Sequence, residues 1–227
     1  MQFGRNLTWF EIVDQALHAQ RLLRAEHSSL THVVFMGMGE PMANYTQVVT
    51  AIRWLVGRQG LGMSPRRIVV STAGLIPGIL SLSQEGLPLT LAISLHSARD
   101  ELRNQLVPVN RKYSLEPLMA AAHTYFGRTG RRVSFEYTLL AGVNDGLRDL
   151  DELARLLGQH WVHLNVIPYN PVPGLGFGTP SDQAVAWFVA QLEAKGVRAT
   201  VRETKGRSVD AACGQLSAQH QLAPTEA

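Results

Sequence analysis

Residues that could hold a small ligand follow an apolar run early in this chain of 227 residues. Residues 32–36 are apolar and β-branched, as in a buried strand, and MGMGEP at 36–41 follows. Gly37 and Gly39 leave room for a ligand to approach the backbone, and Glu40 supplies a charged acceptor. A tight turn after a core strand would look the same, so this stretch alone does not establish a ligand site.

Three later apolar runs also end in polar residues. Ser71 ends the second run, Ser94-Leu95-His96 ends the third, and Asn170 follows the run at 162–167. Each has an ordinary explanation, because serine and asparagine are common in turns and a single histidine is more often hydrogen-bonded than catalytic. Together they favour a ligand with an amine, a carboxylate, ribose hydroxyls and an adenine edge, which needs about this many polar contacts.

The single cysteine, Cys213, lies in a loop of small residues at 210–216, beyond the last predicted strand. Gly214 would let a bulky partner approach, and the basic residues between 202 and 207 could favour a thiolate. Lone cysteines are usually inert, so its physical context leaves a reactive role open. One cysteine does exclude an internal disulfide and a multi-cysteine metal site within these residues.

Two further candidates carry weaker signals. His160 and His163 have a spacing that could suit a metal, but no third ligand lies near them in the sequence, and we predict no metal site. Glu136 lies inside a predicted strand, where it could be a site carboxylate or a paired structural one. The sequence leaves its role unassigned.

The elements that would position these residues alternate between strand and helix. The predicted strands are nearly uniformly apolar and lie at 32–36, 67–71, 89–94, 133–139, 162–167 and 197–201. The predicted helices lie at 9–24, 45–58, 77–83, 114–127, 147–157 and 179–195, and a polar connection is predicted between residues 97 and 114.

This alternation predicts an α/β fold with a parallel sheet covered by helices, curled toward a partly closed barrel. The carboxyl ends of parallel strands meet at one edge, so Gly39-Glu40, Ser71, Ser94–His96 and Asn170 should converge there. We predict one domain over residues 1–216 and a flexible tail at 217–227.

Composition limits the class of protein further. The hydrophobic content of 45% supports a packed core, and the net charge of +3 with a pI near 9.3 permits a polyanionic partner without requiring one. No apolar run is long enough to span a bilayer, and the amino terminus lacks the apolar core of a signal peptide. We therefore expect a cytoplasmic protein without a membrane partner.

Eight segments together resemble the RlmN/Cfr group of radical S-adenosylmethionine (SAM) RNA adenine methyltransferases. The resemblance runs in register from about residue 3 to residue 216. It is carried by GRNL at 4–7, MGMGEP at 36–41, STAG at 71–74, AISLH at 92–96, VPVN at 107–110, NDG at 144–146, NVIPYNP at 165–171 and DAACGQL at 210–216.

The resemblance implies a partial (β/α)6-type radical SAM barrel. It also implies that Gly39 and Glu40 hold the methionyl end of SAM, while Ser71, Ser94-Leu95-His96 and Asn170 contact its other parts. Cys213 would be the catalytic cysteine that accepts a methyl group from one SAM and presents it to the RNA base.

The implied reaction is methylation of adenosine at C2 in 23S rRNA, with tRNA as a further candidate substrate; the sequence does not decide between C2 and C8. These carbons are poor nucleophiles, so family members use a radical generated from a second SAM at a [4Fe-4S] cluster. The resemblance further implies an electron donor, and we expect a monomer.

The chain departs from the family pattern at its start. The CxxxCxxC motif that ligates the cluster, a second catalytic cysteine and an RNA-binding domain would all lie upstream, as would the first barrel strand. Without that strand, residues 32–36 would have an exposed edge. A truncated gene model would explain this departure.

Two other functions remain open at this stage. A non-catalytic SAM- or RNA-binding remnant would also explain the missing cysteines. An unrelated barrel enzyme acting on a phosphorylated metabolite is a third interpretation, and the lack of a glycine-rich phosphate loop near the last strands counts against it.

Overall fold

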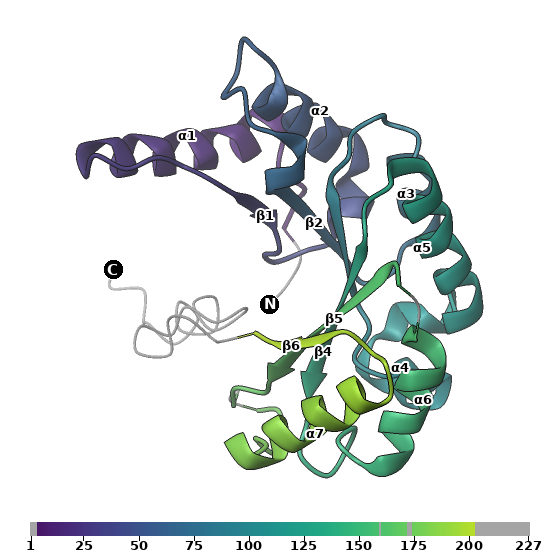
Figure 1. The fold of residues 1–227 in the computed structure, drawn as a ribbon. Helices are drawn as coiled ribbons and strands as arrows, with labels where there is room; N and C mark the ends of the chain where they lie inside the picture. The colour runs from purple at the N-terminus through teal and green to yellow at the C-terminus, as the bar shows by residue number, and fades with distance from the viewer. Residues whose placement is uncertain (1–3, 159, 172–173, 203–227) are drawn as a thin grey trace.

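A computed structural model describes residues 4–158, 160–171 and 174–202 of the chain, and its elements alternate as the sequence predicts (Figure 1). The strands are β1 Val33–Phe35, β2 Ile68–Thr72, β3 Thr90–Ser94, β4 Val133–Leu139, β5 Val162–Pro168 and β6 Ala199–Val201. The α-helices are α1 Trp9–Ala25, α2 Tyr45–Val56, α3 Ile76–Leu82, α4 Asp100–Leu106, α5 Leu115–Thr129, α6 Leu147–Leu157 and α7 Asp182–Ala194. Three short 3-10 helices, η1 Pro41–Asn44, η2 Pro65–Arg67 and η3 Pro108–Arg111, complete the order.

The described strands form one open, six-stranded sheet in the order β1-β2-β3-β4-β5-β6. Every neighbouring pair is parallel, so all carboxyl ends point to the same edge. The sheet is curved, with helices along its outer side, and β1 and β6 form its two free edges (Figure 1). This confirms the predicted partial barrel of parallel strands.

The two faces of the sheet differ in chemistry. Alternate residues such as Leu91, Phe135 and Leu164 belong to the apolar core beneath the helices. The residues between them, such as Ser94 and Glu136, lie on the opposite, inner face. The prediction of nearly uniformly apolar strands is therefore wrong for β4 and β5, where polar residues alternate with apolar ones, because no second layer of described helices covers the inner face.

The helix ends follow local sequence signals. Before α1, the Thr8 backbone N–H donates to the Glu11 carboxylate at 2.8 Å, as the spacing of a capping box predicts. Gly130 follows α5 with φ of 66°, a left-handed conformation that glycine adopts without a steric penalty. These local signals determine where α1 begins and where α5 ends.

Helix α4 occupies the segment predicted to be a polar connection. Its charged sequence lacks an apolar stripe because Arg103, one of its inward-facing residues, is a fully buried arginine. The hydrophobic pattern therefore does not reveal this helix, and Arg103 becomes central to the site described next.

Within the described segments, no helix combines the length and apolar character needed to cross a membrane. The proposed tail at 217–227 and Cys213 both fall outside the described residues.

Candidate functional site

The glycine-rich loop after β1 is held against the end of β2 by Glu40. One carboxylate oxygen of Glu40 accepts from the Met42 backbone N–H at 2.9 Å, and the other accepts from the Ala73 N–H at 2.7 Å. Gly39, just before it, is exposed and has a φ of 94°, which side-chain-bearing residues rarely adopt. The loop therefore exposes the Gly39 backbone at the end of β1, and the Glu40 carboxylate holds the loop in place.

The buried guanidinium of Arg103 connects the ends of β2 and β3. Its Nη2 donates to the Ala73 carbonyl at 2.8 Å and to the Ser94 carbonyl at 2.9 Å. Its Nε donates to the Leu95 carbonyl at 3.1 Å. A planar guanidinium with five N–H donors can hold several carbonyls in fixed relative positions, which a lysine ammonium cannot do.

The charge of Arg103 is balanced indirectly. Its Nη1 donates to the Asn110 side-chain oxygen at 2.5 Å, and the Asn110 amide donates to Asp100 at 2.8 Å. Burial lowers the pKa of Arg103 to about 10, while the Asp100 charge acts in the opposite direction. The guanidinium therefore stays protonated at neutral pH and places a positive charge beneath the strand ends.

His96 follows β3 in a strained backbone conformation, with a φ of 56°. Its Nδ1 accepts from the Thr138 N–H at 3.0 Å, which leaves the proton of a neutral ring on Nε2. Burial and the nearby Arg103 charge lower the pKa of His96 to about 4. At neutral pH the half-buried ring is consequently an uncharged donor through Nε2.

Asn144 joins the His96 backbone to the end of β4. Its fully buried side-chain amide donates to the His96 carbonyl at 2.9 Å and to the Thr138 carbonyl at 2.8 Å, while its oxygen accepts from the Leu140 N–H at 2.7 Å. All donors and one acceptor site of the amide are used locally, so Asn144 is a structural support rather than a free ligand group.

These contacts form one continuous set, which we call the strand-end network: Glu40, Ala73, Arg103, His96 and Asn144, with the backbone groups they bind. It joins the carboxyl ends of β1, β2, β3 and β4. The loops at this edge are therefore held in fixed relative positions by buried polar contacts.

The structure places the other predicted site residues near this edge with less direct support. Ser71 is a buried residue of β2, Leu95 is fully buried, and Asn170 is half-buried two residues after the end of β5. Leu95 and Ser94 enter the strand-end network through their carbonyls. Among described residues, the side chains of Ser71 and Asn170 make no hydrogen bond to the network.

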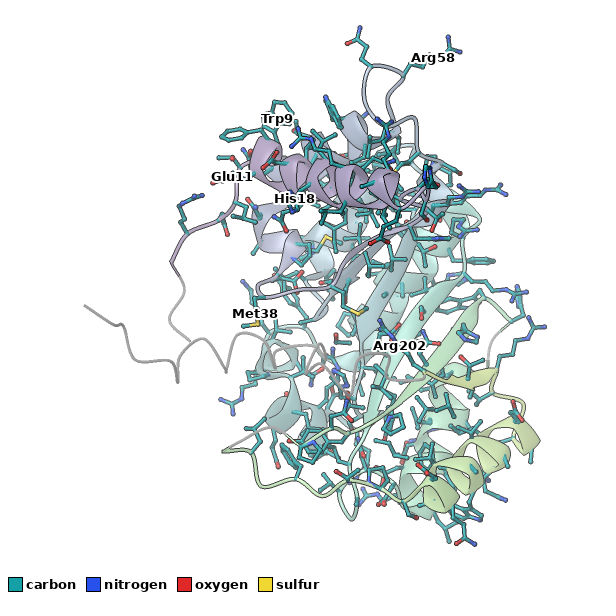
Figure 2. The ribbon with its side chains drawn as sticks, turned by 90° about the vertical axis from the view of Figure 1, so that its left-hand side faces the viewer. Trp9, Glu11, His18, Met38, Arg58 and Arg202 are labelled. Atoms are coloured by element: carbon teal, nitrogen blue, oxygen red, sulfur yellow. The ribbon has the colours of Figure 1, made fainter. Side chains whose placement is uncertain are left out.

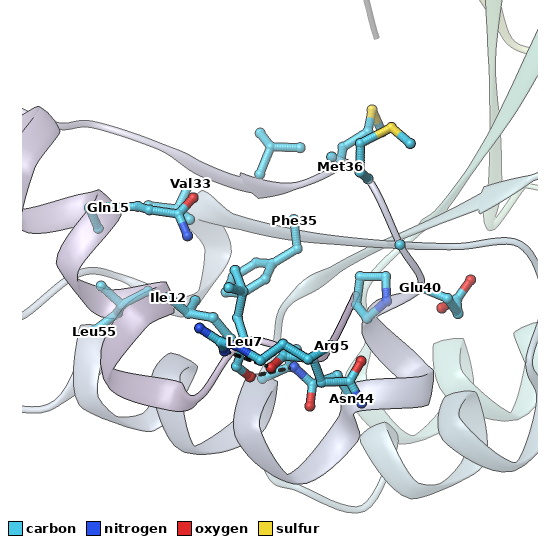
Figure 3. A pocket seen from close by; sticks show the side chains of 18 of the residues that line it. Arg5, Leu7, Ile12, Gln15, Val33, Phe35, Met36, Glu40, Asn44 and Leu55 are labelled. Atoms are coloured by element: carbon cyan, nitrogen blue, oxygen red, sulfur yellow. Dashed lines mark hydrogen bonds between the residues drawn. The ribbon is translucent and has the colours of Figure 1, made fainter. Parts of the chain in front are cut away.

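A cavity of about 720 Å³ lies between α1, β1 and the glycine-rich loop (Figure 3). It is lined by apolar side chains such as Ile12 and Phe35, and only Gly39 and Glu40 of the predicted site residues border it. Figure 3 shows Glu40 at one end of this group of side chains, beyond Met36. The polar residues of the candidate site instead lie on the inner face and edge of the sheet.

Sequence reasoning does not identify Arg103, Asn110 and Asn144 as support residues. Asn110 and Asn144 belong to two of the segments that carry the family resemblance. Those segments mark both residues as important but do not show what the residues do. Arg103 has no motif signal, because a single arginine in a charged helix looks like a solvated one.

Comparison with known proteins adds the decisive observation, since residues 3–157 match the radical SAM superfamily. The chain belongs to the radical SAM superfamily. A curated relative from Rhodopirellula baltica, named "Probable dual-specificity RNA methyltransferase RlmN", is 51% identical over 212 residues, which cover 93% of this chain and 57% of the relative. A relative of the same name from Frankia alni is 48% identical, covering 95% of this chain and 53% of its own length.

Solved structures agree with the fold. The crystal structure of a radical SAM methyltransferase from Sphaerobacter thermophilus superposes with a TM-score of 0.91 at 46% identity, covering 94% of this chain and 62% of that one. SAM-bound SuiB from Streptococcus suis has a TM-score of 0.62 at 12% identity, which shows the fold alone. The resemblance to RlmN-type proteins is confirmed, and the chain spans just over half the length of those curated relatives.

The superfamily implies two groups, SAM and an iron–sulfur cluster, and the residues fit them unequally. The exposed Gly39 backbone, the neutral His96 donor and the polar inner face suit a zwitterionic nucleoside. A three-thiolate cluster does not fit, because the sequence holds one cysteine. In the described segments no three His, Cys, Asp or Glu side chains gather as a metal site, and His163 contacts Thr200 instead.

Proposed function

We propose that this chain forms the SAM-binding part of a radical SAM RNA methyltransferase that acts on C2 of adenosine in 23S rRNA, with tRNA as a second substrate. The whole enzyme would then include residues beyond those of this sequence. Its relatives' names support RNA methylation, and C2 is our choice between the two candidate carbons of adenine.

The observation that carries the proposal is the strand-end network. A flexible edge could not hold a nucleoside in one orientation, whereas here Glu40 and Arg103 tie the ends of three strands together. Binding groups on rigid elements lose little conformational entropy when the ligand arrives.

The predicted binding residues have roles in this proposal, except Leu95, whose side chain is fully buried. The backbone at Gly39 and the anchored Glu40 loop bind the methionyl end. His96 donates from Nε2, and Ser71, Ser94 and Asn170 supply small polar contacts to the remainder. SAM held there would supply the methyl group for transfer, and a second SAM would supply the adenosyl group for the radical chemistry.

Cys213 is proposed to carry the methyl group to the base. It lies outside the described residues, so this role rests on the segment DAACGQL at 210–216. No step through an iron–sulfur cluster is assigned to residues of this chain, because the thiolates for it are absent from the sequence.

The test is deletion of the gene in the source organism, with mass spectrometry of its 23S rRNA. We expect 2-methyladenosine to disappear, to return with the unmodified gene and to stay absent with Cys213→Ala. An unchanged amount of 2-methyladenosine after deletion would contradict the proposal.

One observation favours a second candidate, a non-catalytic SAM- or RNA-binding protein: the sequence contains only one cysteine. For that function, deletion leaves 2-methyladenosine unchanged while the purified chain still binds SAM or RNA. The two measurements together distinguish the candidates.

A further inference from the structure

Glu136 is a buried carboxylate whose two oxygens have different surroundings. It lies in the middle of β4 on the inner face, and its side chain is only 5% exposed. Its Oε1 accepts two hydrogen bonds, from the Ser134 hydroxyl and from the Asn165 amide, each at 2.9 Å. Its Oε2 has no hydrogen-bond donor among the described residues.

Two polar neighbours of Glu136, Ser134 and Asn165, already use their side-chain donors within this cluster. The Asn165 amide nitrogen donates both to Glu136 and to the Ser134 hydroxyl, while its oxygen accepts from Thr200. The single Ser134 proton is already donated to Glu136. These bonds hold Oε1 from two sides and leave Oε2 as the carboxylate oxygen without a hydrogen bond among the described residues.

Arg202 does not complete the network. Its Nη1 is 3.7 Å from Oε2 of Glu136, beyond hydrogen-bond length, and donates instead to the Met36 sulfur at 3.1 Å. Arg202, labelled in Figure 2, follows β6, and its side chain is 45% exposed. A long, half-exposed ion pair contributes little on its own, so the buried oxygen keeps most of its unmet acceptor capacity.

Strand register places Glu136 in the candidate site. Ser94 pairs with Glu136, Glu136 pairs with Asn165, and Asn165 pairs with Thr200. These residues form one row across four strands on the inner face, and neighbouring strands lie about 4.8 Å apart. Glu136 is therefore the immediate neighbour of Ser94, one of the proposed SAM contacts.

We propose that Oε2 of Glu136 accepts a hydrogen bond from a hydroxyl or amine of the cofactor's adenosine half. This deepens the proposed function and rests on it, because the methionyl end is assigned to the Gly39–Glu40 loop at β1. Glu136 lies three strands away from β1, on the side where the nucleoside must then lie. An unpartnered buried acceptor is costly, and a ligand donor removes that cost.

The test compares Glu136→Gln with the unmodified chain by calorimetric titration with SAM and with 5′-methylthioadenosine, which lacks the amino-acid half. Glutamine keeps an acceptor for Ser134 and Asn165 and replaces Oε2 with a donor. We expect about tenfold weaker binding of both probes, with a thermal midpoint no lower than that of the unmodified chain. Asp151→Asn is the charge-matched control, because Asp151 is exposed on α6, and it should bind both probes normally.

Each other outcome is informative. Equal affinity of Glu136→Gln and the unmodified chain overturns this inference and leaves the proposed function standing, whereas failure of the unmodified chain to bind either probe overturns both. Weaker binding of SAM alone shows that Glu136 meets the amino-acid half, contrary to the inference. If Glu136→Gln unfolds, Glu136→Asp is measured, and unfolding of that variant as well assigns the carboxylate to stability instead of binding.

Discussion

At the scale of single residues, the candidate site depends on buried polar groups whose partners are almost fully specified. Arg103 spans three carbonyls, Asn144 spans two strand ends, and His96 is held in one tautomer by a backbone N–H. Such groups are costly when a partner is removed, because the remaining group stays buried without a hydrogen bond. Their loss should therefore affect both stability and site geometry.

His96 makes stability depend on pH. Its pKa is lowered from 6.5 to about 4 in the folded chain, so the unfolded chain takes up a proton first as the pH falls. Stability is fully present above about pH 6.5 and should decrease, on the order of 2 to 3 kcal/mol, as the pH approaches 4. Urea unfolding at pH 7.5, 5.5 and 4.5 measures this decrease.

The matched variant for that measurement is His96→Asn, which keeps an acceptor for the Thr138 N–H and removes the titrating group. Its stability should depend less on pH over the same interval. Identical pH dependence in the two proteins would show that His96 does not titrate in this way.

Arg103→Met should destabilise the chain by about 3 to 4 kcal/mol, because it leaves the carbonyls of Ala73, Ser94 and Leu95 without their donor. Chemical denaturation of purified protein measures the change. Arg155→Met is the control, since the Arg155 side chain is 77% exposed on α6, and it should change stability by less than about 0.5 kcal/mol. A loss of stability below about 1 kcal/mol for Arg103→Met would contradict the role of Arg103 in joining the ends of β2 and β3.

At the scale of elements, the loops that follow the strands present different chemical groups. The loop after β1 presents backbone to a ligand, and the loop after β3 presents a neutral histidine. Helix α4, directly beneath them, supplies the arginine that joins their ends. The outer helices hold the sheet, and the carboxyl-end loops carry the polar groups.

Gly39→Ala tests the loop after β1. The φ of 94° at Gly39 makes any side chain strained, at a cost of about 1 kcal/mol, and the loop should lose much of its affinity for SAM. Gly86→Ala is the matched control, because Gly86 has a φ of 68° and lies before β3, at the opposite end of the sheet. Both variants should lose similar stability, and only Gly39→Ala should bind SAM more weakly.

Equal SAM binding by the two glycine variants would contradict the role of the loop. Calorimetric titration gives the affinity and thermal unfolding gives the stability, so strain and ligand contact are separated. Added methyl groups meet no atom within 4 Å at either glycine, and steric clash therefore does not confuse the comparison.

Strand identity and order could be predicted from the sequence because each strand carries apolar residues that face the helices. The same reasoning misses α4, since Arg103 takes an inward position that an apolar residue would mark. It also leaves Glu136 unassigned, because its meaning depends on strand register, which aligns it with Ser94 and Asn165. Contacts between residues far apart in the chain decide these roles, and local patterns do not contain them.

At the scale of the whole molecule, an open sheet with one apolar and one polar face explains both fold and site. Helices bury the outer face as the core, while the inner face keeps a row of polar side chains across β3 to β6. A closed barrel of eight strands would fill its interior with packed side chains. Here the six described strands form a sheet that is open at β1 and β6, which suits a nucleoside laid across the strand ends.

The most direct test of SAM binding at the strand ends is hydrogen–deuterium exchange of the purified chain with and without SAM. We expect slower exchange in peptides covering residues 37–40, 73–75, 94–97 and 169–171, and no change around residues 84–88 at the other end of the sheet. Binding of SAM with protection confined to segments away from these strand ends would contradict the site.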